Sequence, residues 1–267
     1  MTADIAMSSF QKKESTPFSP DELPMLAGRP VPLKHLSAGE ELFAPGARTD
    51  DIYGIVSGWA YSYRLFEDGR RQINAIELPG SLIGVASSGR DGAAVGCATL
   101  TPVVYCVYPR AVLFGRVMSE PALGLRIVSE VVRQEVLIRE RLSDVARRPA
   151  RERIANFLHE LYCRRRISGP LDRPFSIPLT QSHIADALGL TPIHVSRTLR
   201  EFKRDRIATY VGHDLQIIDP GKLARISTLD LGYTRWLAGS GQVTPVEPAA
   251  PPPHGASMRP VLEARPG

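Results

Sequence analysis

The chain has 267 residues, of which 43% are hydrophobic and 23% charged, with a formal net charge of +5 and a pI near 9.3. This length accommodates two modest domains, and the composition is that of an ordinary globular protein. The mild positive charge favours an anionic partner without identifying one. No apolar run reaches about 18 residues and no secretion signal is visible, so we expect a cytoplasmic protein without a membrane span.

The three cysteines are Cys97, Cys106 and Cys163. An odd, sparse set argues against a disulfide framework, and the absence of C-x-x-C spacing argues against a zinc or iron–sulfur site. Oxidation of one of these thiols and a purely structural role are both open at this stage. We find no nucleophile–base constellation, P-loop or metal-spaced cluster, so we expect no catalytic residues, no metal, no cofactor and no enzyme activity.

Both ends of the chain have compositions that disfavour a packed core. Residues 1–28 are polar and rich in Pro and Ser, and we expect a mostly disordered leader with one short helical turn near Asp21–Ala27. Residues 229–267 include Gly-Ser-Gly and Pro-Pro-Pro, and we expect a mostly disordered tail.

Short alternating segments separated by turn signals predict a small antiparallel barrel or roll between them. The turn Asp68-Gly69 is a good hairpin signal. On one strand, Trp59, Tyr61, Tyr63 and Leu65 share a face, which favours packing in a core or a domain interface over a ligand cage. The predicted strands are Asp51–Val56, Trp59–Phe66, Arg71–Leu78, Gly96–Leu100 and Val103–Tyr108.

A long helix is predicted over Glu120–Arg147, with one apolar row close to a heptad seam and a second row on a neighbouring face. One row can pack on the roll while the other pairs with a second subunit, although burial inside a monomer is the alternative. Gln134 in the seam would cost stability and help to fix register. The seam comprises Leu123, Ile127, Val131, Gln134, Ile138, Leu142 and Val145, and the second row Leu125, Val128, Val132 and Val136.

Pro149 ends that helix, because proline cannot continue the interior hydrogen-bond ladder. A further helix is predicted over Ala150–Cys163, and a short strand over Phe175–Ile177. Arginines concentrate in Arg139–Arg166, beside the motif described next. Such a basic region is typical of nucleic-acid binding, and a solvated helix face is the alternative.

Residues 179–204 read LTQSHIADALGLTPIHVSRTLREFKR and predict a helix-turn-helix. Thr180 is a natural N-cap for a helix that runs to Leu188, and Gly189 stands where a left-handed residue is needed. Thr191-Pro192 opens the second helix. Two short strands, Ile207–Val211 and Leu215–Ile218, then predict a hairpin wing.

The second helix is expected to read bases in the major groove through residues near its start. Arg197 can donate two hydrogen bonds to guanine, and His194 and Ile193 lie beside it as further base-reading candidates. The remaining candidates are polar or basic and suited to the DNA backbone, where they add salt-sensitive affinity. They are Thr180, Gln181, Ser182, Thr191, Ser196, Arg200, Lys203 and Arg204.

The chain resembles the Crp/Fnr family of bacterial transcription regulators in three features. They are the glycine-punctuated roll, with AGEELFAPGARTDDIYGIVSGWAYSYRLFEDGRRQI and LPGSLIG, the long helix that follows it, and the motif LTQSHIADALGLTPIHVSRTLREFKRD. The resemblance covers about Pro32–Asp219. It implies an α+β homodimer that binds a palindromic promoter site, with RNA polymerase as a further partner. The GRRQI stretch is similar to the FixK-like group. The implied domains are a cyclic-nucleotide-binding-like roll (29–118), a dimerisation helix (119–147) and a winged DNA-binding domain (148–228).

Two departures from the family pattern carry predictions. Cyclic-nucleotide-binding members have a Gly-Glu pair and, further on, an Arg-Ser/Thr pair, whereas this chain has Gly84-Val85, Arg90-Asp91 and Ala93-Ala94. A buried phosphate would lack its counter-charge, so we predict no cyclic-nucleotide binding. In the reading helix Ile193 replaces a Glu that accepts from cytosine. The alternative to a plain regulator is an effector-gated sensor whose roll binds a small ligand or responds to redox state.

Overall fold

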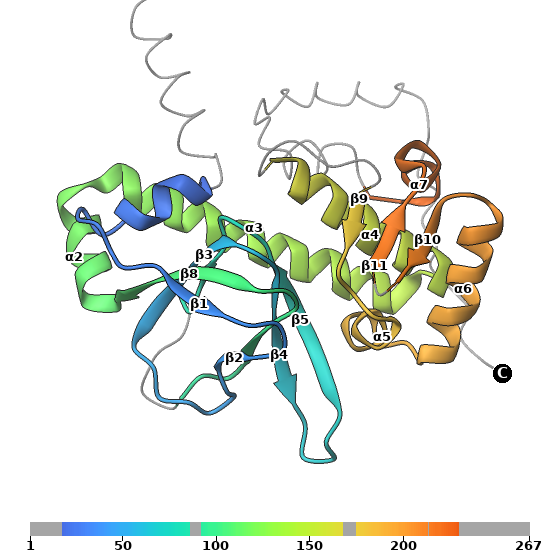
Figure 1. Cartoon of the computed structure of the whole chain (residues 1–267), viewed down its shortest axis with the longest axis horizontal. Coiled ribbons are helices and arrows are strands. Elements are labelled where there is room, and N and C mark those ends of the chain that lie inside the picture. Colours follow the sequence, from blue (N-terminus) through green and yellow to red (C-terminus); the bar gives the residue numbers. More distant parts are fainter. Residues whose placement is uncertain (1–17, 86–91, 168–174, 213, 230–267) are drawn as a thin grey trace, which may run out of the picture.

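The computed structural model describes residues 18–85, 92–167, 175–212 and 214–229. Figure 1 shows a β-roll, a C-terminal domain of helices and short strands, and one long helix that runs behind both. This arrangement confirms the predicted α+β class. None of the helices in the described ranges combines the length and the apolar character needed to cross a membrane.

The roll consists of two four-stranded antiparallel sheets with strand orders β1-β8-β3-β6 and β2-β7-β4-β5. All five predicted strands are present, and the hairpin turn at Gly69 has a φ of 81°. Three further strands are too short for an alternating pattern to reveal them. The bounds are β1 Lys34–Leu36, β2 Glu41–Phe43, β3 Asp51–Ser57, β4 Ala60–Leu65, β5 Arg71–Glu77, β6 Leu82–Ile83, β7 Gly96–Thr99 and β8 Val103–Pro109.

The short helical turn expected near Asp21–Ala27 is confirmed, because a 3₁₀ helix, η1, spans Pro20–Met25. The expected disorder is wrong for residues 18–28, since Phe18, Leu23 and Leu26 are buried against the roll. The Tyr108 hydroxyl donates to the Leu23 carbonyl at 2.5 Å. Three apolar side chains in a polar stretch are enough to dock it, because the roll supplies the rest of the core. The remainder of the leader, and the tail from residue 230, lie outside the described residues.

Two helices follow the roll, α2 (Arg110–Ser119), which was not predicted, and α3 (Pro121–Arg147). Leu123 and Ile127 of α3 are buried in a cluster with Leu113 of α2 and residues of the roll. The expected seam is therefore wrong at this end of the helix, since these two side chains are already covered by their own chain. Val131 and Gln134 are half-buried, and Gln134 donates to the Leu82 carbonyl at 3.3 Å.

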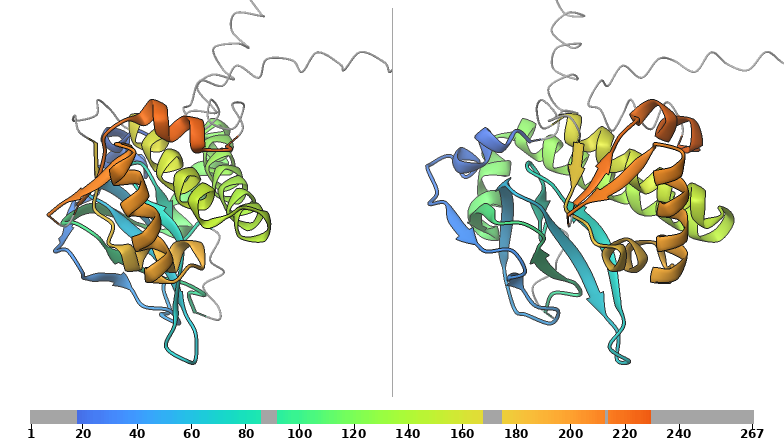
Figure 2. Two further views of the ribbon diagram at one scale, coloured as in Figure 1. Left: turned by 90° about the vertical axis from the view of Figure 1, so that its right-hand side faces the viewer. Right: turned by 45° about the vertical axis from the view of Figure 1, so that its right-hand side comes forward.

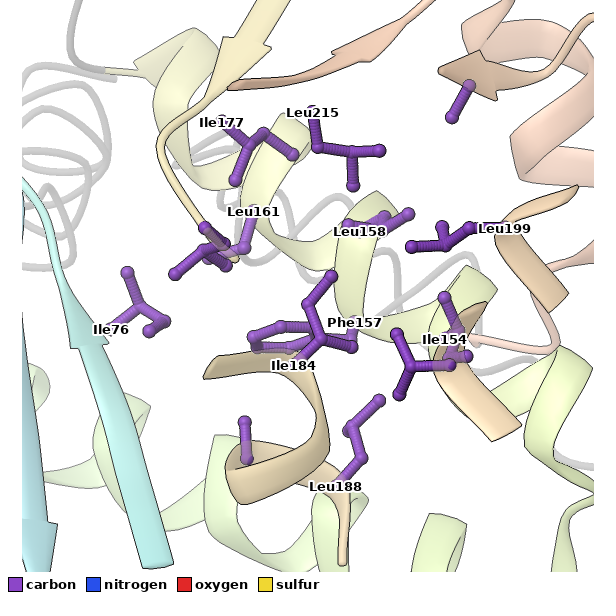
Figure 3. Packing of buried hydrophobic residues seen from close by; sticks show 14 of the residues in the cluster. Ile76, Ile154, Phe157, Leu158, Leu161, Ile177, Ile184, Leu188, Leu199 and Leu215 are labelled. Carbon is purple, nitrogen blue, oxygen red and sulfur yellow. The ribbon is translucent and has the colours of Figure 1, made fainter. Parts of the chain in front are cut away.

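The C-terminal domain packs three helices and a three-stranded sheet around α4 (Figure 2). Buried side chains of β9, α5, α6 and β11 lie around Phe157 and Leu158 of α4 (Figure 3). The final helix, α7, was not predicted. The bounds are α4 Ala150–Ile167, β9 Phe175–Ile177, α5 Gln181–Leu188, α6 Pro192–Arg204, β10 Ala208–Val211, β11 Asp214–Ile217 and α7 Pro220–Ile226, with sheet order β10-β11-β9.

Candidate nucleic-acid interface

Helices α5 and α6 begin and end as their sequences predict. The Thr180 hydroxyl accepts from the His183 amide at 3.2 Å and caps α5, and Gly189 closes it with φ 61° and ψ 37°. Thr191 caps α6, its hydroxyl accepting from the His194 amide at 3.3 Å, and Pro192 takes the first helical position. The caps satisfy amides that would otherwise lack partners, so both N-termini are well defined.

The apolar side of α6 fixes which residues of that helix face outward. Val195, Thr198, Leu199 and Phe202 are buried against the rest of the domain. Their spacing follows the helical repeat, so the opposite face must be exposed. The predicted helix-turn-helix scaffold is confirmed.

The outward face of the first turn of α6 carries Ile193 and His194, with Arg197 one turn further along. Ile193 is 77% exposed, and the other two side chains are exposed as well. The His194 ring Nδ1 lies 3.2 Å from the Thr191 hydroxyl. Within the described part of the chain Arg197 makes no hydrogen bond or ion pair. A guanidinium in this state is ready to bind an external acceptor.

The acidic residue of α6 and its C-cap aspartate are held away from this face by one arginine. Arg151 donates to Glu201 and to Asp205, each at 2.9 Å, and its guanidinium lies 5.2 Å from the Phe202 ring centroid. Arg204 also pairs with Asp205, at 3.2 Å. Because these carboxylates are engaged, the reading face keeps an uncompensated positive charge.

The predicted backbone-contacting residues lie at the starts of the two helices and along α6. Thr180 and Ser182 are exposed and Gln181 is half-buried at the start of α5. Along α6, Ser196 is half-buried and its carbonyl accepts from Arg200 Nε at 3.4 Å. The other members are exposed: Thr191, Arg200, Lys203 and Arg204.

The predicted wing is present as the antiparallel pair β10–β11, in which Ala208 pairs with Ile217. The Tyr210 hydroxyl donates to the Leu179 carbonyl at 2.8 Å, so the wing is tied to the segment that enters α5. Burial of the Tyr210 ring raises its pKa, and the phenol stays neutral as the donor of this bond. His213 lies outside the described residues.

A contact between the roll and α5 was not predicted. Arg71 of β5 donates through Nε to Asp186 at 2.9 Å and through Nη1 to the Tyr61 hydroxyl at 2.8 Å. The Tyr61 ring lies 5.5 Å from the His183 ring, and Gln72 donates to the Ala187 carbonyl at 3.3 Å. Burial, with a further contribution from Arg71, lowers the pKa of His183, so this ring enters the contact neutral.

The aromatic face of β4 has the packing role that its pattern predicts. Trp59, Tyr61 and Tyr63 are buried in the cluster that also contains the core of the C-terminal domain, and the Trp59 and Phe175 ring centroids are 6.4 Å apart. Leu65, the last member of the predicted stripe, is exposed. The domain interface thus draws on this face of β4.

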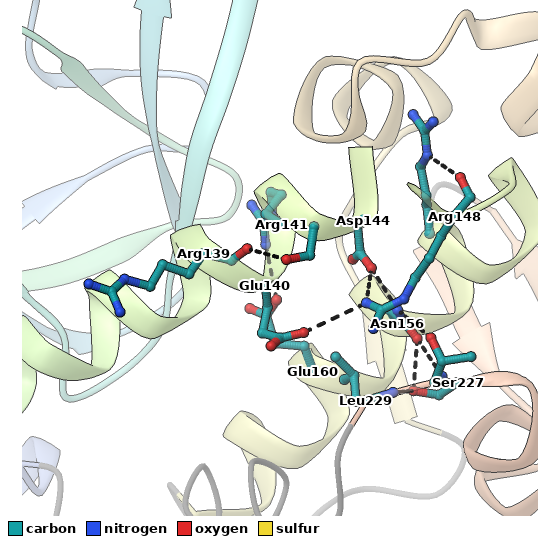
Figure 4. A network of polar contacts seen from close by, with 12 residues as sticks. Arg139, Glu140, Arg141, Asp144, Arg148, Asn156, Glu160, Ser227 and Leu229 are labelled. Atoms are coloured by element: carbon teal, nitrogen blue, oxygen red, sulfur yellow. Dashed lines mark hydrogen bonds and ion pairs between the residues drawn. The ribbon is translucent and has the colours of Figure 1, made fainter. Parts of the chain in front are cut away.

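Most arginines of the segment 139–166 are half-buried, and several pair with carboxylates of the same chain, so their density does not by itself identify a nucleic-acid surface. Glu160 accepts from Arg141 at 3.0 Å and from Arg164 at 3.1 Å. Arg148 pairs with Asp144, which also accepts from Asn156 at 2.8 Å. Figure 4 shows these polar contacts linking the end of α3 to α4 and to the residues after α7.

A cavity of about 430 Å³ lies between the roll, α3 and α4. Apolar groups from β6 and α3 line it, together with charged side chains that are mostly paired with one another. The Ser62 hydroxyl donates to Glu77 at 2.7 Å, and Arg133 lies 3.3 Å from Glu130. Burial raises the pKa of Glu130. Arg90 and Asp91, which stand near the expected phosphate-binding pair, lie outside the described residues.

Comparison with known proteins identifies two domains in the chain. A Crp-like helix-turn-helix domain matches residues 152–226, and a cyclic nucleotide-binding domain matches residues 33–119. The nitrogen fixation regulation protein FixK of Bradyrhizobium diazoefficiens is 32% identical over 199 residues, covering 72% of this chain and 81% of FixK. The chain belongs to the Crp/Fnr family. It is a DNA-binding transcription regulator of that family.

Two further similarities agree with this family membership. The transcriptional activatory protein AadR of Rhodopseudomonas palustris is 31% identical over 182 residues, covering 68% of this chain and 75% of AadR. The solved structure of FixK2 from Bradyrhizobium japonicum matches with a TM-score of 0.65 and 23% identity, covering 75% of this chain and 98% of FixK2. This structural match supports the fold, and the sequence matches support the family.

Proposed function

We propose that this Crp/Fnr regulator binds a palindromic promoter site as a homodimer, with α6 of each subunit in the major groove of one half-site. The observation that carries the proposal is the state of Arg197, which is exposed and unpaired within the described residues while the carboxylates of Glu201 and Asp205 are engaged by Arg151. Arginine in this position can donate two hydrogen bonds to guanine. His194 and Ile193 complete the base-reading set.

The proposed backbone contacts follow from the same placement. The capped start of α5 carries Thr180, Gln181 and Ser182, where backbone amides and hydroxyls can meet phosphate oxygens. Arg200, Lys203 and Arg204 continue the positive face along α6 and would add affinity that depends on salt but not on sequence.

The test is selection of preferred DNA from a random pool by the purified full chain. We expect a palindrome, and we expect Arg197→Ala to lose about 10- to 100-fold in affinity for the selected site. Arg70→Ala is the matched control, because Arg70 is an exposed arginine in the β4–β5 turn. Equal affinities for the wild type and Arg197→Ala would refute the assignment of the reading helix.

We propose that the exposed apolar side chains of α3 form the dimer seam. Leu142 is 68% exposed and Val128 is 58% exposed, and the others are exposed to a similar degree. Leu125, Val128 and Val132 are separated by steps of three and four, as are Ile138, Leu142 and Val145, and a step of six joins the two groups. Steps of three and four are those of a two-stranded coiled coil. This seam retains Ile138, Leu142 and Val145 of the predicted set and replaces its first members by Leu125, Val128 and Val132.

The seam is tested by Leu142→Glu, which should convert the dimer to a monomer in sedimentation velocity and abolish binding to the full palindrome. Leu65→Glu is the control, since Leu65 is comparably exposed on the roll and lies outside the seam. A Leu142→Glu protein that stays dimeric would show that the seam is elsewhere.

The remaining parts of the proposal concern domains and partners. We propose domain limits of 18–118, which extend the expected 29–118 by the docked η1 segment, and of 119–147 and 148–228. We propose RNA polymerase as a partner by analogy with relatives described as activators. Because DNA is the ligand that the chemistry of α6 fits, we propose that the protein acts on the bacterial chromosome in the cytoplasm. We propose no enzymatic role.

A second candidate function, effector gating, is favoured by the position of β5. Asn74, Ala75 and Glu77 of this strand line the cavity, and Arg71 and Gln72 of the same strand contact α5. An effector in the cavity would act on a strand that touches the DNA-binding domain. Redox gating is disfavoured, because burial raises the pKa of the thiols of Cys97, Cys106 and Cys163.

A thermal-shift assay would test whether the effector of this second candidate function is a cyclic nucleotide. We expect cyclic AMP and cyclic GMP to leave the melting temperature unchanged, because Ala93-Ala94 stands about where the family's phosphate-binding Arg-Ser/Thr pair is expected. The cavity arginines Arg141 and Arg164 are paired with Glu160. A saturable shift with either nucleotide would overturn this expectation.

A further inference from the structure

Ile193 is the only large hydrophobic side chain exposed on α6, and it stands at the second position of that helix. Apart from Pro192 at its first position, the other exposed side chains of this helix are polar or basic, among them His194, Arg197 and Arg200. An isolated exposed isoleucine elsewhere on the surface would need no explanation. Here it stands at the leading edge of the helix that we propose reads DNA, and the present inference rests on that proposal.

The local structure holds Ile193 in a defined orientation. The hydroxyl of Thr191 accepts from the His194 amide, and Pro192 restricts the backbone just before Ile193. The β-branched side chain of isoleucine strongly prefers one χ1 rotamer in a helix, so its methyl groups project in one direction at little further entropic cost. Ile193 and Arg197 are four residues apart, so both lie on the same face, with their Cβ atoms about 6 Å apart.

The chemistry of the major groove offers one partner for such a side chain. Ile193 can neither accept a hydrogen bond from the cytosine amino group nor donate one to guanine or adenine. The apolar group that base edges present in the major groove is the C5-methyl of thymine. We propose that Ile193 recognises a thymine in each half-site through this methyl group, near the guanine that Arg197 recognises.

The size of the effect follows from the area of contact. Removing one methyl group from an apolar contact costs about fourfold in affinity, by the usual value for a buried carbon. A palindrome presents the contact twice, so replacement in both half-sites should cost about 15-fold if the two contributions add.

The experiment uses the selected palindrome and replaces its thymines one symmetric pair at a time by deoxyuridine, which differs only in lacking the C5-methyl. We expect wild-type affinity to fall about 15-fold at one pair of positions. Ile193→Ala should bind thymine and deoxyuridine at those positions equally well. Placing cytosine there should weaken wild-type binding, and 5-methylcytosine should restore part of the loss. Because Ile193 is exposed, the Ala variant should retain the wild-type melting temperature.

The following results would distinguish a failure of the role proposed for Ile193 from a failure of the proposed DNA-binding function. If 7-deazaguanine at the conserved guanine weakens binding while no deoxyuridine replacement does, Arg197 reads DNA as proposed and the role assigned to Ile193 is wrong. If wild type and Ile193→Ala show the same penalty for deoxyuridine, another side chain contacts the methyl group. Failure to select any specific sequence would refute the proposed function itself.

Discussion

Arg197 on α6 is exposed and free of ion pairs in the described structure, whereas the side chains of Arg141 on α3 and Arg164 on α4 are only 12% and 13% exposed and share Glu160. Both groups come from arginine-containing helices less than 60 residues apart in sequence. What separates them is the packing around each helix. Arg141 also donates to the Asn74 carbonyl and Arg164 to the Ile76 carbonyl, and these hydrogen bonds join the roll to α3 and α4. Arg197 has no such partner because its helix buries the opposite face.

The difference shows that arginine density alone is a poor indicator of a DNA-binding surface. Buried pairs are worth little when compared with an apolar replacement, but removal of one partner leaves a buried charge uncompensated. Exposed arginines contribute little to stability and remain available to phosphates and bases. The two groups should therefore respond to mutation in opposite ways, one in stability and the other in DNA recognition.

The largest expected effect is on stability, at Glu160. Glu160→Ala should lower the free energy of unfolding by about 3–5 kcal/mol, because Arg141 and Arg164 would be left buried without their counter-charge. Urea denaturation followed by circular dichroism would measure it. Glu135→Ala is the control, since the Glu135–Arg139 pair is exposed and its loss should cost less than about 1 kcal/mol. Equal losses in the two variants would remove the contrast between buried and exposed pairs.

The second effect is on recognition, at Arg197. Arg197→Lys keeps the charge but loses the paired donor geometry that fits guanine. Affinity for the selected site should fall about tenfold, while the slope of affinity against salt concentration and the melting temperature stay unchanged. Fluorescence anisotropy at several salt concentrations would measure both quantities. Full activity in the Lys variant would mean that Arg197 contacts only phosphate.

The third expected effect is on stability, at Thr191, which caps the N-terminus of the reading helix α6. Thr191→Ala removes the acceptor of the His194 amide and should destabilise the protein by about 1 kcal/mol. Thr191→Ser retains the hydroxyl and should be close to wild type in thermal denaturation. If the Ala and Ser variants melt at the same temperature, the cap contributes nothing to the order of α6.

The smallest effect is expected at Lys203, further along the exposed face. Lys203→Ala should reduce the slope of log affinity against log salt by about 1 in magnitude, as expected when one phosphate contact is lost. The preferred DNA sequence should not change. A changed sequence preference would place Lys203 among the base-reading residues instead.

The helix-turn-helix could be predicted from sequence almost residue by residue because its signals are local. Thr180, Gly189 and Thr191-Pro192 each specify a backbone conformation through their own chemistry, and the structure places them as expected. The five longer strands were also predictable, since alternation over six or seven residues is a strong pattern.

The parts that could not be predicted depend on partners distant in sequence. Whether Leu123 faces the roll or a second subunit is decided by α2, a helix whose own pattern was missed. The docking of Phe18 and Leu23 depends on the roll, and the bond between Arg71 and Asp186 joins residues 115 positions apart. No local periodicity carries information about such contacts.

The contact between β5 and α5 also has a consequence for DNA. Through Arg71, Tyr61 and Asp186 the helix-turn-helix is attached to the roll as well as to the end of α3. In a symmetric dimer, this double attachment would fix the distance and angle between the two reading helices. The protein would then measure length along the duplex, tolerating a substitution in the central spacer but not the insertion of one base pair, which rotates one half-site relative to the other by about a tenth of a turn.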